Sequence, residues 1–91
     1  MGYNLEISDK ATAEIADFKK TDPVSFRKIT KFLEELIEHP EQGTGKPEML
    51  KGDLSGYWSR RINKKDRLIY SINDEDIIVY VLKAKGHYFD K

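Results

Sequence analysis

The spacing of apolar residues changes at a loop that contains Gly43, Gly45 and Pro47. Before the loop, between residues 9 and 38, apolar side chains recur every three or four positions, as on one face of a helix. After it they fall in short runs rich in aromatic and β-branched residues, as in strands. A chain with helix-like spacing in one half and strand-like spacing in the other is typical of the α+β class.

The helical part divides into two helices joined by a tight turn. Ser8 or Asp9 can cap a first helix that ends near position 20, because their side-chain oxygens accept hydrogen bonds from free amides of the first turn. Asp22 then suits a second cap, and Pro23 suits a first helical position, where no amide is needed. The second helix ends near Glu38, so we expect an antiparallel helical hairpin.

The later half of the chain predicts a sheet. Three runs read as strands: 57–62, 67–72 and 77–82. Short, turn-like connections favour an antiparallel meander, and a further short strand is expected within 49–54. With an alternating strand at 3–7, the predicted order is β-α-α-β-β-β. We expect a single domain over residues 1–91: an antiparallel sheet with the helical hairpin packed on one face.

Composition excludes several classes of protein. No cysteine is present, which excludes a disulfide scaffold, a thiolate zinc site and a cysteine nucleophile. His39 and His87 are not at metal-ligand spacing, and Gly43-Thr44-Gly45-Lys46 lacks the spacing of a phosphate loop, so no metal or cofactor is expected. The longest apolar run is five residues and no secretory signal is visible, which predicts a cytoplasmic protein without a membrane span.

Charge is balanced in total but not along the chain. Sixteen basic and sixteen acidic residues cancel, yet residues 1–45 carry a net −3 and residues 46–91 a net +3. The basic residues between 46 and 67 form a strip: Lys46, Lys51, Arg60, Arg61, Lys64, Lys65 and Arg67. Such a strip is either a solvated charged face or a nucleic-acid contact, and composition leaves both interpretations open.

Glu48, the basic strip and His87 together suit one reaction, the cleavage of RNA through its own 2′-hydroxyl. That reaction needs a base for the 2′ proton, an acid for the leaving 5′ oxygen and cations for the charge on phosphorus. Glutamate and histidine can supply the first two, and arginine suits the third. A loop carboxylate, a surface histidine and ion-paired arginines are the ordinary alternatives, and residue types alone do not exclude them.

Four linked motifs distinguish between these interpretations of Glu48, His87 and the arginines. They are Gly45-Lys46-Pro47-Glu48-Met49-Leu50-Lys51, Leu54-Ser55-Gly56-Tyr57-Trp58-Ser59-Arg60-Arg61-Ile62, Asp66-Arg67-Leu68-Ile69-Tyr70 and His87-Tyr88. In this order they closely resemble the YoeB/Txe family, toxins of bacterial toxin–antitoxin modules within the RelE-like superfamily. The resemblance implies a microbial RNase, RelE-like fold and a metal-independent mRNA endoribonuclease that acts in the ribosomal A site.

The resemblance also implies roles for individual residues. Glu48 would be the general base, Arg67 would stabilise the scissile phosphate, His87 would be the general acid, and Tyr88 would place the substrate. Further RNA contacts would come from the other cations of the strip: Lys46, Lys51, Arg60, Arg61, Lys64 and Lys65. The products would be a 2′,3′-cyclic phosphate and a 5′-hydroxyl. Family members commonly end near the histidine–tyrosine pair, whereas Phe89-Asp90-Lys91 follow it in this chain.

The partners implied by the resemblance are a cognate YefM-like antitoxin, the ribosome with its A-site mRNA, and a second toxin copy in a homodimer. One alternative is a catalytically silent RelE-like module that binds antitoxin or ribosome without cleavage. Another is a metal-independent RNase that acts on free RNA. A net charge of zero argues against this last activity, because free RNA is held mainly through its phosphates.

Overall fold

The computed structural model describes residues 2–86 of the chain. Its elements, in chain order, are β1 (Asn4–Ile7), α1 (Asp9–Thr21), α2 (Pro23–Glu38), β2 (Glu48–Met49), β3 (Tyr57–Arg61), β4 (Arg67–Asn73) and β5 (Ile78–Lys83). The expected order of helices and strands is therefore confirmed. The expected short strand at 49–54 is β2 followed by one 3₁₀ turn over Gly52–Leu54.

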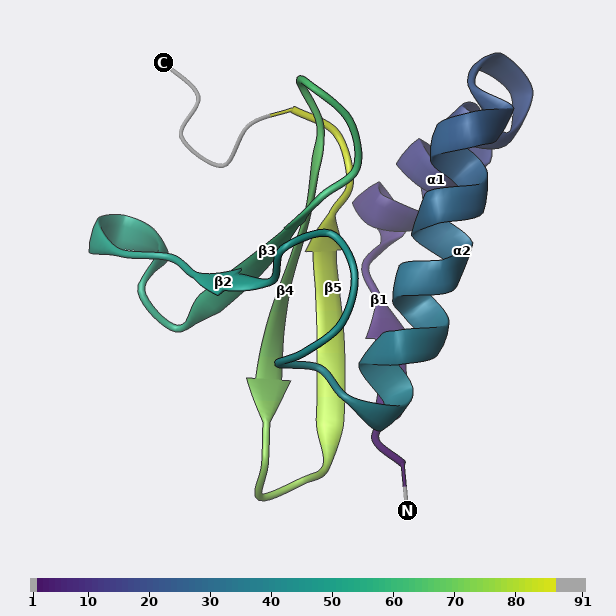
Figure 1. Cartoon of the computed structure of the whole chain (residues 1–91). Helices are drawn as coiled ribbons and strands as arrows, with labels where there is room; N and C mark the ends of the chain where they lie inside the picture. The colour runs from purple at the N-terminus through teal and green to yellow at the C-terminus, as the bar shows by residue number, and fades with distance from the viewer. Residues whose placement is uncertain (1, 87–91) are drawn as a thin grey trace.

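Both helices begin at the residues that can cap them. The Ser8 hydroxyl accepts a hydrogen bond from the Ala11 amide at 2.9 Å, which opens α1. The Asp22 carboxylate accepts from the amide and the hydroxyl of Ser25, while Pro23 occupies the first turn of α2. One residue thus ends α1 and starts α2, which keeps the connection tight and places the helices side by side (Figure 1).

The sheet has five strands in the order β1-β5-β4-β3-β2. The three long strands form the predicted antiparallel meander, and β2 extends it with Glu48 opposite Ser59. The sheet is mixed, however, rather than wholly antiparallel, because β1 pairs with β5 in parallel, with Leu5 opposite Val79. No tight turn joins these two strands: the rest of the fold connects them, and such a connection permits parallel pairing.

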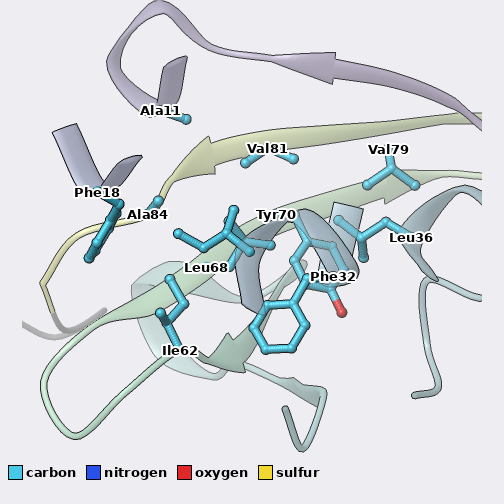
Figure 2. Close-up of a cluster of buried hydrophobic side chains, with 11 residues drawn as sticks. Ala11, Phe18, Phe32, Leu36, Ile62, Leu68, Tyr70, Val79, Val81 and Ala84 are labelled. Atoms are coloured by element: carbon cyan, nitrogen blue, oxygen red, sulfur yellow. The ribbon is translucent and has the colours of Figure 1, made fainter. Parts of the chain in front are cut away.

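The helices cover one face of the sheet and form the core with it. Figure 1 shows both helices beside β1 and β5, with β2 at the opposite edge. The core joins side chains from α1, α2 and the inner face of β4 and β5, as Figure 2 shows: Ala11, Phe18, Phe32, Leu36, Leu68, Tyr70, Val79 and Val81. Within residues 2–86, no helix has both the length and the apolar character needed to cross a membrane.

Candidate functional site

Strand register gathers the predicted base and two arginines on one face of the sheet. Glu48 lies directly opposite Ser59, and Arg61 lies directly opposite Arg67. Residues that pair directly across strands share a face, and residues two apart on one strand share it at a spacing of about 7 Å. Glu48, Arg61 and Arg67 therefore share one face, with Arg61 on the strand between the strands that carry the other two.

This face is turned away from the helical hairpin. Trp58 packs against the core on the helix side, so the alternation along β3 directs Ser59 and Arg61 to the other side. Glu48 and Arg61 are exposed, and Arg67 is half-buried. An anionic ligand approaching this side meets a carboxylate and two guanidinium groups without displacing a helix.

The predicted lysines lie in the segments that adjoin this face. Lys46 precedes β2, Lys51 follows it, and Lys64 and Lys65 lie in the turn between β3 and β4; all four are exposed. The side-chain oxygen of Asn63 fixes that turn by accepting hydrogen bonds from the amides of residues 65 and 66, both at 2.9 Å. The exposed part of the basic strip thus borders the site.

Arg60 is the exception among the predicted RNA contacts. Its side chain is 0% exposed and lies on the core face of β3, between the rings of Phe32 and Tyr70. Its guanidinium donates hydrogen bonds to acceptors inside the protein, including Glu35 at 2.5 Å. A fully buried guanidinium cannot touch an RNA phosphate in this conformation, so the position does not support the predicted contact. The alternation along β3 is the reason: Arg60 points inward where Arg61 points outward.

Glu35 is the counter-charge of Arg60 in the interior. Partial burial alone would raise the pKa of the Glu35 carboxyl, but hydrogen bonds from the amide and hydroxyl of Thr44 and from Arg60 outweigh it and lower the pKa. Glu35 is therefore ionised at neutral pH. The paired charges join α2 to β3 and to the loop that leads to β2.

His87 and Tyr88, the predicted acid and substrate-placing residue, lie outside the described residues. The chain just before them is held by carboxylates. Glu14 accepts hydrogen bonds from the amides of residues 84 and 85, and Asp66 accepts from the Gly86 amide at 2.9 Å. The Arg67 amide in turn donates to the Gly86 carbonyl at 3.2 Å. Gly86, the residue before His87, is thus fixed against the strand start that carries Arg67.

Sequence reasoning did not single out the residues that support the site. Glu35, Thr44 and Tyr70 surround Arg60, while Glu14 and Asp66 hold residues 84–86. The available signal was an arginine on the core face of a predicted strand, since a buried guanidinium requires acceptors. Which acceptors serve it depends on long-range packing that periodicity does not contain.

One more buried group lies beside the predicted base. The Ser59 hydroxyl, opposite Glu48, is buried and has no hydrogen-bond partner within the described part of the chain. Across residues 2–86, no three histidine, aspartate or glutamate side chains come together in a group that could hold a metal ion.

Comparison with known proteins places these features in a family. Residues 7–88 match the model of the YoeB-like toxins of bacterial type II toxin–antitoxin systems. The toxin YoeB of Mycobacterium bovis is 46% identical over 67 residues, which cover 74% of this chain and 76% of that protein.

Solved structures agree in fold. A YoeB/ParE toxin from Agrobacterium tumefaciens has a TM-score of 0.86 at 32% identity, covering 93% of this chain and 99% of that one. YoeB of Staphylococcus aureus has been solved as a dimer, with a TM-score of 0.81, and in a heterotetrameric complex with YefM, with a TM-score of 0.80. In both structures the matched chain is 34% identical to this one, and the match covers 94% of this chain and 98% of the solved chain. This chain belongs to the YoeB-like toxins of bacterial type II toxin–antitoxin systems.

Proposed function

We propose that this toxin is a ribosome-dependent endoribonuclease that cleaves mRNA in the A site without a metal ion. Glu48 takes the proton from the 2′-hydroxyl, and the 2′ oxygen attacks the adjacent phosphorus. Arg67 stabilises the negative charge that builds on the phosphate oxygens. His87 protonates the leaving 5′ oxygen, and Tyr88 places the substrate. The products are a 2′,3′-cyclic phosphate and a 5′-hydroxyl, so atoms and protons balance without a further reactant.

The observation that carries this proposal is the shared face of Glu48, Arg61 and Arg67. A base and a phosphate-binding cation must reach the same nucleotide, and β3 alone separates the strands that carry Glu48 and Arg67, so both long side chains can extend toward one ligand above β3. Arginine suits the phosphate because its planar fork donates two parallel hydrogen bonds. Gly86, the last described residue, is held beside the start of the strand that carries Arg67.

The distribution of charge supports the proposed dependence on the ribosome. The exposed cations Lys46, Lys51, Lys64 and Lys65 border the site, but the whole chain has a net charge of zero. A few phosphate contacts of this kind give weak binding to free RNA at physiological salt. We propose that the ribosome supplies the remaining contacts and presents the A-site codon, which also places the toxin in the cytoplasm.

The proposed protein partner is a YefM-like antitoxin, and the toxin itself is proposed to form a homodimer. Both follow from the Staphylococcus aureus relative, solved as a dimer and as a heterotetramer with YefM. An antitoxin segment that folds on binding can cover a large surface of a small toxin. We propose that it covers the face that carries Glu48 and Arg67.

The proposal is tested by mapping mRNA ends in a purified ribosome complex with a defined A-site codon. Wild type is expected to cut within that codon only when ribosomes are present, and Glu48→Gln is expected to lower the rate about 10²- to 10⁴-fold, the usual contribution of a general base. Equal urea unfolding curves for the two proteins are the control for folding. If folded wild type leaves the message intact, a catalytically silent binding module becomes the better description.

A further inference from the structure

The guanidinium of Arg60 has every N–H donor directed at an acceptor inside the protein. Nε donates to the Tyr70 hydroxyl at 3.2 Å. Nη1 donates to the Glu35 carboxylate at 2.5 Å and to the Thr44 carbonyl at 3.3 Å. Nη2 donates to the carbonyls of His39 at 3.0 Å and Gln42 at 2.7 Å. A side chain with five placed donors is a structural centre rather than a ligand contact.

Most of these acceptors belong to the loop between α2 and β2. The carbonyls of His39, Gln42 and Thr44 lie in one stretch that has no strand or helix to pair them. Partly buried carbonyls need donors, and the Arg60 guanidinium supplies one to each of the three, while the Gln42 amide also donates to the His39 carbonyl at 3.2 Å. Glu35 closes the arrangement from the other side, because it accepts hydrogen bonds from the amide and hydroxyl of Thr44 at 2.9 and 3.0 Å.

The same loop delivers Glu48, and β3 holds it at three successive residues. The Arg61 amide donates to the Gly45 carbonyl at 2.7 Å, Arg60 binds the preceding carbonyls, and Ser59 lies opposite Glu48. The strand that contains Glu48 has only two residues and forms the edge of the sheet. A strand of two residues makes few hydrogen bonds to its neighbour and is held weakly by them. The position of Glu48 therefore depends on how the preceding loop is held.

We propose that Arg60 and Glu35 are positioning residues for Glu48: the partly buried ion pair fixes the loop at residues 39–45 and thereby the carboxylate that follows it. This inference rests on the proposed role of Glu48 as general base. Misplacement of a reacting group by about 1 Å can cost about 100-fold in rate. Loosening the loop should therefore slow the chemical step while leaving RNA and antitoxin binding in place.

The first test is Glu35→Gln, which keeps the shape of the side chain and removes its charge. We expect the single-turnover rate at saturating ribosome concentration to fall about 10- to 100-fold, with antitoxin affinity and ribosome affinity unchanged. Glu34→Gln is the matched control, since Glu34 is the neighbouring residue of α2 and is exposed. It should cut at the wild-type rate.

A double-mutant cycle separates positioning from general weakening. If Glu35 acts through Glu48, then Glu35→Gln combined with Glu48→Gln should cut no more slowly than Glu48→Gln alone. Two effects that multiply would overturn the positioning role and leave the proposed function intact. A Glu48→Gln protein that cuts at the wild-type rate would overturn both.

A second variant keeps the test valid if Glu35→Gln fails to fold. Thr44→Val removes only the exposed hydroxyl that donates to Glu35, and it retains the backbone hydrogen bonds of the loop. Thr44→Val should lower the cleavage rate by less than Glu35→Gln does. In a protein that already carries Glu48→Gln, it should lower the rate no further. A wild-type rate for Thr44→Val, or a fall in its rate that multiplies with that of Glu48→Gln, would exclude the proposed coupling.

Discussion

At the scale of single residues, two non-glycine residues within 2–86 have a left-handed backbone, Lys46 and Ile77, and the β-branched Ile77 favours it least. Ile77, in the turn between β4 and β5, has φ +56° and is 47% exposed. A β-branched side chain is costly in this left-handed region, by about 1–2 kcal/mol, whereas asparagine tolerates it. Ile77→Asn is expected to raise the free energy of unfolding by about 1 kcal/mol, measured by urea denaturation.

Ile77→Val is the matched control for that measurement. Valine is also β-branched, so it keeps the unfavourable conformation and should bring no gain. The Ile77 carbonyl accepts a hydrogen bond from the Asn4 amide at 2.8 Å, and both variants retain it because it belongs to the backbone. Equal stability of the asparagine and valine variants would contradict the explanation by strain.

Glu35 gives a second prediction at this scale, a dependence of stability on pH. Its hydrogen bonds from Thr44 and Arg60 outweigh the effect of burial and hold the pKa of the carboxyl below its ordinary value. A lowered folded-state pKa stabilises the protein above the unfolded value of about 4.3, and this stabilisation is lost as the pH falls through the folded value.

Glu35→Gln should therefore be less stable than wild type at pH 7, by about 2 kcal/mol, the range for hydrogen bonds to a charged group. The difference should shrink as the pH falls through the folded-state pKa of Glu35, because protonation then removes the same charge from wild type. Urea unfolding of both proteins at pH 7, 5 and 3 measures it. A difference that is the same at all three values would show that the charge of Glu35 does not contribute.

At the scale of elements, the loop before β2 depends on close approach as well as on hydrogen bonds. Gly45 has φ +81°, and a Cβ there would lie 2.6 Å from the ring of Phe32. Phe32 is 2% exposed and belongs to the core, so it cannot move aside without cost. Gly45→Ala is expected to destabilise the protein through both the backbone conformation and this contact.

Gly56→Ala separates the two contributions. Gly56 has φ +97°, but a Cβ at this position would meet nothing within 4 Å. Both variants bear the conformational cost of about 1–2 kcal/mol, and only Gly45→Ala adds a crowding cost of about 1–3 kcal/mol. Thermal or urea unfolding of both proteins should rank Gly45→Ala as clearly less stable. An equal loss would mean that the loop can move away from Phe32.

The elements themselves could largely be predicted from sequence, because their signals are local. The capping residues Ser8 and Asp22 predicted where the two helices begin. The alternation along β3 predicted that Trp58 points inward. The parallel pairing of β1 with β5 could not be predicted, since no short turn encodes it. The acceptors of Arg60 were equally inaccessible: they come from α2, from the loop before β2 and from β4, which only the complete fold brings together.

At the scale of the whole molecule, the fold separates the charges that cancel in the total. Residues 1–45 have a net charge of −3 and supply the helices that cover one face of the sheet, whereas Arg61 and Arg67 of the later half lie on the opposite face. A small protein can in this way present a local positive field without a net positive charge. The proposed contact with RNA depends on that field.

Charge reversal at two places in the fold tests this dependence. Lys64→Glu with Lys65→Glu changes the turn between β3 and β4, where both side chains are exposed and the chain leads into Arg67. Cleavage on the ribosome should fall at least about 10-fold at low salt, and the slope of log rate against log salt should decrease by about one for each lost phosphate contact. Arg27→Glu with Lys31→Glu makes the same change in net charge on exposed positions of α2. If this second variant loses as much activity as the first, total charge governs the toxin's binding, and the separation of charge between the two faces does not.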